Sequence, residues 1–152
     1  MAAAEGPVAV GCDHAGLALK REIVSELRER GRSIEDFGTD SEASVDYPDY
    51  AEVVARSVAA GGQPFGILVC GTGIGMAMAA NKVPGIRAAL CHTEWEARLA
   101  REHNDANVLC LGGRVLGPGL ALAIVQAFLG GRFEGGRHQR RVEKMAKMEG
   151  RA

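Results

Sequence analysis

The chain has few aromatic residues, no long apolar segment and almost no net charge, and each shortage excludes a class of protein. Aromatic residues make up 5% of the 152 residues, and 18 Lys and Arg against 19 Asp and Glu leave a formal net charge of −1. Nucleic-acid binders carry a strongly basic surface, so we expect no nucleic-acid partner. No apolar run approaches the ~20 residues of a membrane span, and residues 1–10 lack the basic start and apolar stretch of a signal peptide. We expect a cytoplasmic protein without a membrane partner.

Paired cysteines are also missing. The four cysteines are Cys12, Cys70, Cys91 and Cys110, and no two of them form a CxxC pair. Zinc-ribbon and thioredoxin-like sites therefore have no support, and we expect no metal site. Thiols stay reduced in the cytosol, so we expect no structural disulfide. A redox role for Cys12, Cys91 or Cys110 is left open by the sequence.

The chain's length and composition fit one globular α/β domain. Apolar residues make up 47% of the chain and charged residues 24%, and 152 residues is about one domain. Short apolar runs predict strands at residues 7–11, 34–37, 65–70, 86–90 and 108–111. Amphipathic segments predict helices at residues 17–30, 50–60, 73–82, 93–102, 120–129 and 140–149. We therefore predict a single domain over residues 1–152, with a five-stranded parallel sheet covered on both faces, a C-terminal helical tail and disorder in residues 1–6.

Polar and glycine-rich residues follow three of the predicted strands. Asp13 and His14 follow the first strand, residues 70–75 end the third, and residues 112–114 follow the fifth. Residues 103–105 lie at a helix end just before the fifth strand. Open parallel sheets bind ligands at the carboxyl ends of their strands. Loops gathered at one edge of the sheet would bring all of these residues together.

Residues 70–75 (CGTGIG) predict an anion-binding turn that begins with a thiol. Backbone N–H groups of a glycine-rich turn at a helix N-terminus hold an anion. The segment lacks the GK[ST] of a P-loop and the spacing of a dinucleotide fingerprint, which disfavours a nucleotide-binding module. A cysteine just before a helix N-terminus is stabilised as the thiolate, the form that acts as a base or nucleophile. The alternative is a tight turn after a buried strand-end cysteine.

Further along the chain, a basic tail predicts a phosphate site. Residues 132–152 hold seven Arg and Lys against three Glu. Arg137 and Arg141 are four residues apart and share one face of a helix, and two guanidiniums together suit a phosphate dianion. A solvated helix face is the alternative. Asp13 and His103 are candidates for binding or acid–base chemistry, and for both the alternative is helix capping. Asp13 would cap the start of a helix, and His103 would cap the end of one. The chemistry alone predicts a small phosphorylated substrate and leaves the reaction type open.

Six short motifs occur in order along nearly the whole chain. They are GCDHAG at 11–16, DYPDYA at 46–51, CGTGIG at 70–75, AANKVPGIRA at 79–88, REHNDANVLCLGGR at 101–114 and EGGRHQRRV at 134–142. Together they resemble the type B ribose-5-phosphate isomerases, within the wider ribose/galactose-6-phosphate isomerase family. The resemblance implies a Rossmann-like three-layer α/β/α fold and interconversion of ribose 5-phosphate and ribulose 5-phosphate without a metal or organic cofactor. It also implies homodimers, or dimers of dimers, whose active sites use residues of both subunits.

The resemblance implies roles for individual positions. Cys70 matches the base that removes the C2 proton to give a cis-enediol(ate), and His103 matches the residue that opens the furanose ring, with Asn104 beside it. The remaining matched positions hold the substrate: Asp13 and Tyr47 its hydroxyls, and His14, Arg114, Arg137 and Arg141 its phosphate. Thr72 and the amides of Gly71, Gly73 and Gly75 are placed to stabilise the negative charge that develops on oxygen.

Two alternative functions stay open beside this interpretation. The first alternative is an isomerase of a six-carbon sugar phosphate, such as allose or galactose 6-phosphate. The second is a sugar-phosphate sensor without activity. A sensor is expected to have lost Cys70 or His103, and both are present. In another branch of the family that this chain resembles, a Glu at the start of the following helix takes the place of the cysteine as base. Here Met76 holds that position and cannot accept a proton, so Cys70 is predicted to be the only base.

Overall fold

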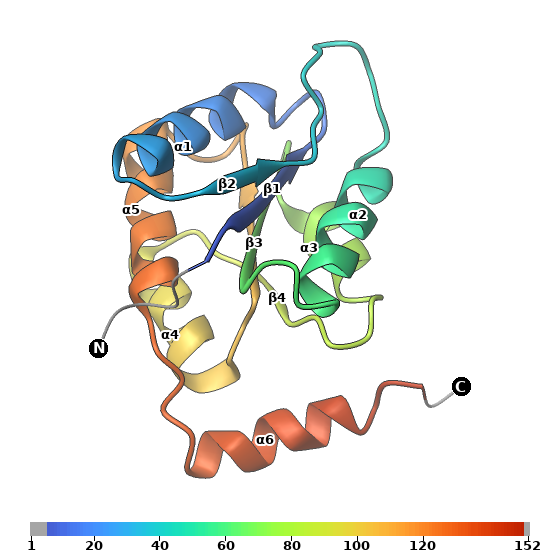
Figure 1. Cartoon of the computed structure of the whole chain (residues 1–152), viewed down its shortest axis with the longest axis vertical. Coiled ribbons are helices and arrows are strands. Elements are labelled where there is room, and N and C mark those ends of the chain that lie inside the picture. The colour runs from blue at the N-terminus through green and yellow to red at the C-terminus, as the bar shows by residue number, and fades with distance from the viewer. Residues whose placement is uncertain (1–5, 151–152) are drawn as a thin grey trace.

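The structure, a computed structural model, describes residues 6–150. The disorder predicted for residues 1–6 therefore lies, except at Gly6, outside the described residues. Strands and helices alternate along the chain (Figure 1). The strands are β1 (Val8–Cys12), β2 (Ile34–Asp36), β3 (Phe65–Cys70), β4 (Ala88–Leu90) and β5 (Val108–Gly112). The helices are α1 (Leu17–Glu29), α2 (Tyr47–Ala59), α3 (Ile74–Ala80), α4 (Glu94–Asn104), α5 (Pro118–Gly130) and α6 (Arg137–Ala146).

The five strands form one parallel sheet in the order β2-β1-β3-β5-β4. Helices cover both faces: α1, α4 and α5 lie on one face, and α2 and α3 on the other (Figure 1). Successive strand residues alternate between the two cores, so that Ile67 packs with the first helix group and Leu68 with the second. Both faces are buried, which explains why the strands read as continuous apolar runs. The predicted three-layer α/β fold is confirmed.

The parallel sheet defines two edges that matter for function. All strands end at one edge, which we call the carboxyl edge, and begin at the other, the amino edge. Each helix that connects two parallel strands returns the chain from the carboxyl edge to the amino edge. The C-terminal end of α4 therefore lies at the amino edge, since β5 starts there. β5 has five residues, so the two edges are about 16 Å apart at ~3.3 Å per residue.

Helix α6 stands apart from the rest of the fold. It follows α5 and lies beyond the amino edge of the sheet (Figure 1). Only His138 and Val142 of this helix are buried, and its contacts with the body are made with α4. The sequence predicted this helix at residues 140–149, three residues too late. In the described part of the chain, no helix is long and apolar enough to cross a membrane.

Candidate active site

Cys70 is the last residue of β3 and lies beneath the glycine-rich turn. Its side chain is buried, and its Sγ accepts a hydrogen bond from the Gly73 N–H at 3.1 Å. Gly73 has a φ of 79°, a conformation that a residue with a side chain rarely adopts. This conformation turns the chain into α3 and directs the amide back at the sulfur. This backbone donor fixes the position of the sulfur beneath the turn, where the base is predicted.

The neighbouring loop after β5 is tied to this turn. The Gly113 N–H donates to the Cys70 carbonyl at 2.8 Å, and the Arg114 N–H donates to the Gly71 carbonyl at 3.0 Å. The Arg114 side chain passes beside Gly71: a Cβ atom added to Gly71 would lie 3.5 Å from Arg114 Nη1. Thr72 is exposed, and its Oγ1 accepts from the Ile74 N–H at 3.2 Å. The predicted phosphate ligand Arg114 and the predicted oxyanion turn thus lie together.

Asp13 and His14 lie at the same edge, directly after β1. The Asp13 N–H donates to the Val69 carbonyl at 3.2 Å, and its Oδ1 accepts from the Gly16 N–H at 3.0 Å. His14 Nδ1 accepts from the Val45 N–H at 3.1 Å. An imidazole nitrogen that accepts carries no proton, so the proton of neutral His14 is on Nε2. That N–H is a donor for an anion such as phosphate.

Tyr47 reaches the turn from the second helix layer. It is the first residue of α2, and its ring lies against Gly75 so closely that a Cβ atom at Gly75 would be 2.5 Å from Tyr47 Cζ. The Tyr47 side chain is 40% exposed, so its hydroxyl is accessible to a ligand at the turn. Gly75 is needed for this approach. The sequence predicted α2 to start at Tyr50, whereas the Asp46 N-cap and the proline in the first turn start it at Tyr47.

The sequence reasoning gave no role to Lys20, which lies in the amphipathic segment predicted as a helix at residues 17–30. Lys20 is 1% exposed. Its Nζ lies 2.9 Å from both Asp36 carboxylate oxygens and 2.9 Å from the Thr39 carbonyl. These bonds anchor the segment between β2 and α2, which supplies the Val45 amide to His14. No signal in the helix pattern distinguishes Lys20 from the exposed lysines and arginines.

A second group of site residues lies at the amino edge. His103 is at the end of α4, one-third exposed, and its ring stacks on that of His138 with centroids 4.1 Å apart and planes 6° from parallel. Glu134 Oε2 lies 3.8 Å from His103 Nε2 and 3.7 Å from His138 Nε2. Arg137 and Arg141 flank His138 on α6, and both are exposed. Sequence reasoning gave no site role to Glu134 or to the buried His138. Glu134 precedes α6, so no helical spacing links the two residues in the sequence.

The structure does not bring all predicted residues together within one chain. Cys70 and the residues around it lie at the carboxyl edge, whereas His103, Asn104, Arg137 and Arg141 lie at the amino edge. The prediction that loops at one edge collect the polar residues is wrong for His103 and Asn104; it did not include Arg137 and Arg141. The reason is topological, because a residue that precedes a strand of a parallel sheet lies at the amino edge.

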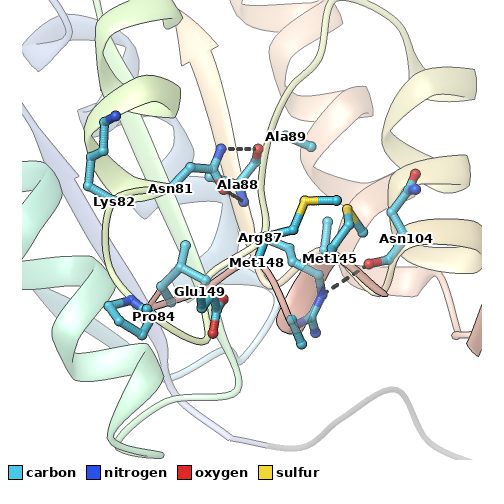
Figure 2. Close-up of a pocket in the computed structure, with 14 residues that line it drawn as sticks. Asn81, Lys82, Pro84, Arg87, Ala88, Ala89, Asn104, Met145, Met148 and Glu149 are labelled. Carbon is cyan, nitrogen blue, oxygen red and sulfur yellow. Dashed lines mark hydrogen bonds between the residues drawn. The ribbon is translucent and has the colours of Figure 1, made fainter. Parts of the chain in front are cut away.

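A cavity of about 820 Å³ lies at the amino edge, between α6 and the start of β4 (Figure 2). Its lining includes Arg87, Asn104, Met145 and Met148. Arg87 Nε donates to the Asn104 carbonyl at 3.0 Å, and Figure 2 shows its side chain extended toward that residue. Cys70 does not line this cavity. The cavity therefore lies apart from the thiol, and of the predicted site residues Asn104 lines it.

The other three cysteines differ from Cys70 in their surroundings. Burial raises the pKa of the Cys12 thiol to about 11 and that of Cys91 to about 12. Burial also raises the pKa of Cys110. These three side chains are therefore protonated at neutral pH and act as small apolar groups. Among the described residues, Cys70 is the cysteine whose sulfur accepts a hydrogen bond from a backbone N–H, that of Gly73.

A thiol beneath a glycine-rich turn, at the carboxyl edge of a doubly wound sheet, is an arrangement typical of an enzyme site for a small anionic substrate. Residues 8–145 match the family described as "Ribose/Galactose Isomerase". The chain is 54% identical over 144 residues to ribose-5-phosphate isomerase B of Escherichia coli, covering 95% of this chain and 97% of that protein. The chain belongs to the ribose/galactose isomerase family and is an isomerase.

Two further relatives show the range of this family. Ribose-5-phosphate isomerase B of Mycoplasma genitalium, solved with bound ribulose 5-phosphate, superposes with a TM-score of 0.92 at 44% identity, covering 96% of this chain and 97% of that one. D-erythrulose-4-phosphate isomerase of Pectobacterium atrosepticum is 44% identical over 143 residues, covering 93% of this chain and 94% of that protein. Relatives at the same identity thus carry names that differ in the length of the sugar chain.

Proposed function

We propose that this protein interconverts D-ribose 5-phosphate and D-ribulose 5-phosphate. The observation that carries the proposal is the Cys70 sulfur held by the Gly73 amide, in a chain 54% identical to a ribose-5-phosphate isomerase B. An aldose–ketose isomerase needs one base that reaches both C1 and C2, and donors for the oxygen on which negative charge develops. The turn at residues 70–75 supplies both.

The chemistry follows from this geometry. The Cys70 thiolate takes the C2 proton of the open-chain aldehyde. The C–H electron pair forms the C1–C2 double bond while the carbonyl pair moves to O1, which gives a cis-enediolate. Amide donors of the turn, with Thr72 Oγ, stabilise the negative oxygen, and each such donor contributes roughly 3–4 kcal/mol. The O2 proton moves to O1, and return of the proton from Cys70 to C1, as the O2 electron pair forms the C2 carbonyl, gives the ketose. The balance is a proton transfer with no net redox change.

The substrate is held at its two ends by different groups. Asp13 and Tyr47 bind its hydroxyls, and the phosphate is bound by His14 through Nε2–H, by Arg114 and by the pair Arg137 and Arg141. Phosphate bound away from the reacting carbons supplies binding energy that orients the carbonyl over the sulfur. His103 opens the furanose ring by transferring a proton between ring oxygen and hydroxyl, with Asn104 next to it.

This assignment requires two chains. His103, Arg137 and Arg141 lie at the amino edge, about 16 Å from the carboxyl edge where Cys70 lies, which is longer than a pentose phosphate. A homodimer, alone or as a dimer of dimers, in which the amino edge of one chain faces the carboxyl edge of its partner completes the site. Helix α6, with only His138 and Val142 buried against its own chain, has an exposed face for such a contact.

A coupled assay with purified protein and EDTA tests the substrate. It compares kcat/KM for ribose 5-phosphate with the values for allose 6-phosphate and galactose 6-phosphate. We expect preference for ribose 5-phosphate. Preference for a hexose phosphate contradicts the substrate and keeps the mechanism, whereas no turnover of any of them by protein with reduced Cys70 favours a sugar-phosphate sensor.

A further inference from the structure

Three metal-ligating side chains meet at the amino edge of the sheet. They come from three segments: His103 from the end of α4, Glu134 from the connection between α5 and α6, and His138 from α6. One ligand atom of each lies within 4.8 Å of those of the other two. The Glu134 N–H donates to the Glu102 carbonyl at 3.0 Å, which fixes the connecting segment against α4. The cluster is therefore held by the backbone and is not a chance meeting of long side chains.

The coordinating atoms of this cluster have no other partner among the described residues. Both imidazole Nε2 atoms lie 3.7–3.8 Å from Glu134 Oε2, beyond hydrogen-bond distance. An imidazole nitrogen that carries no proton has a lone pair for a metal ion.

We propose that His103, Glu134 and His138 form a binding site for one zinc ion. Two imidazoles and a carboxylate, with a fourth position open to water, are a ligand set that zinc takes in proteins. Zn–N bonds of ~2.0–2.1 Å in a tetrahedral site place ligand atoms about 3.4 Å apart. The 3.7 and 3.8 Å separations to Glu134 Oε2 are within a few tenths of an ångström of that value.

Zinc binding requires a change in the histidine stack. The two rings are 6° from parallel, so their nitrogen lone pairs point in parallel directions and do not converge on one ion. One ring has to tilt, and His103, one-third exposed at a helix end, has the room to do so. Arg137 and Arg141 on α6 act against a cation beside His138. We therefore expect an affinity below that of a structural zinc site.

The consequence for activity rests on the proposed function. A zinc ion on His103 occupies the nitrogen that transfers the proton during ring opening. Zinc is thus expected to inhibit turnover of ribose 5-phosphate, and EDTA to restore it. The ion is an inhibitor in this account and not a cofactor.

The site is tested first by binding, without any use of turnover. Zinc chloride is titrated into the metal-free full chain by calorimetry, and Co²⁺ absorption reports the coordination geometry. We expect one zinc per chain. Glu134→Gln and His138→Gln are each expected to weaken binding by more than the roughly 10–100-fold that follows loss of an outer-shell partner. The exposed His92 lies outside the cluster, so His92→Gln is the matched control and is expected to bind as wild type does.

Two results overturn the site. If Glu134→Gln binds zinc as tightly as the wild type does, the site is overturned, whatever His138→Gln shows. Glu134 is half-exposed, so its replacement does not endanger folding. Loss of binding in Cys70→Ser also overturns the site, since it assigns the zinc to the thiol. In the kinetic arm, Glu134→Gln is expected to need at least ten times more zinc for half-inhibition. Failure of the wild type to turn over any sugar phosphate contradicts the proposed function, while the titration still decides the site.

Discussion

Replacing Cys70 with alanine removes the predicted base and one hydrogen-bond acceptor. The Gly73 N–H loses the sulfur at 3.1 Å, which costs roughly 1 kcal/mol, and the loss of a buried apolar atom costs about 1 kcal/mol more. For a chain of this size the sum lowers Tm by about 4–8 °C, so the variant is expected to fold. A positioned general base contributes roughly 10²–10⁴-fold to rate. We expect kcat to fall by at least that factor while ribose 5-phosphate still binds.

Cys110 offers a matched control for this variant. It is fully buried in the neighbouring strand β5 and packs in the same core as Cys70. Cys110→Ala is expected to lower Tm by about half as much, since only the cost of the buried atom applies, with kcat unchanged. The measurements are kcat from the coupled assay, Tm from calorimetry and sugar-phosphate affinity by titration. Retention of a tenth or more of wild-type kcat by Cys70→Ala refutes the assignment of Cys70 as the only base.

Three more predictions separate the other roles. His103→Ala is expected to lower kcat/KM about 100-fold for ribose 5-phosphate but to spare erythrose 4-phosphate, whose O4 carries the phosphate and cannot close a furanose ring; equal losses contradict a ring-opening role. Arg137→Ala is expected to raise KM at least ~10-fold, the effect of losing a charged hydrogen bond, and an unchanged KM removes it from the phosphate site. Iodoacetamide at pH 8 is expected to alkylate Cys70 before Cys12 and Cys91. The thiols of Cys12 and Cys91 have pKa values of about 11 and 12, so only a small fraction of each is the reactive thiolate. Equal labelling of the three cysteines, measured by mass spectrometry, contradicts this.

Much of the fold follows from periodicity along the chain. Runs such as residues 65–70 are apolar at every position because the strand is buried on both faces. A short run of this kind fits few structures other than a buried strand. Helix starts were less certain: α2 begins at Tyr47 because Asp46 and Pro48 form its first turn, a signal weaker than the apolar stripe that starts at Tyr50. The buried Lys20 shows the limit of the pattern, since its partners Asp36 and Thr39 lie far along the chain.

The site was predictable residue by residue but not in its arrangement. Cys70 and the glycines after it were identifiable from composition and order, because a turn that ends a strand and starts a helix needs them. The placement of His103 at the opposite edge depends on which strand follows it, and the stack with His138 depends on how α6 returns to α4. Neither contact has a local sequence signal.

The central claim is that each active site takes Cys70 from one chain and His103 from its partner. Mixing Cys70→Ala and His103→Ala chains through unfolding and refolding tests it most directly. Each mixed dimer then holds one site with both residues intact, and half of the dimers are mixed, so about a quarter of wild-type activity on ribose 5-phosphate is expected to return. Activity that stays at the level of the two separate variants, although mixed dimers form, contradicts a shared site.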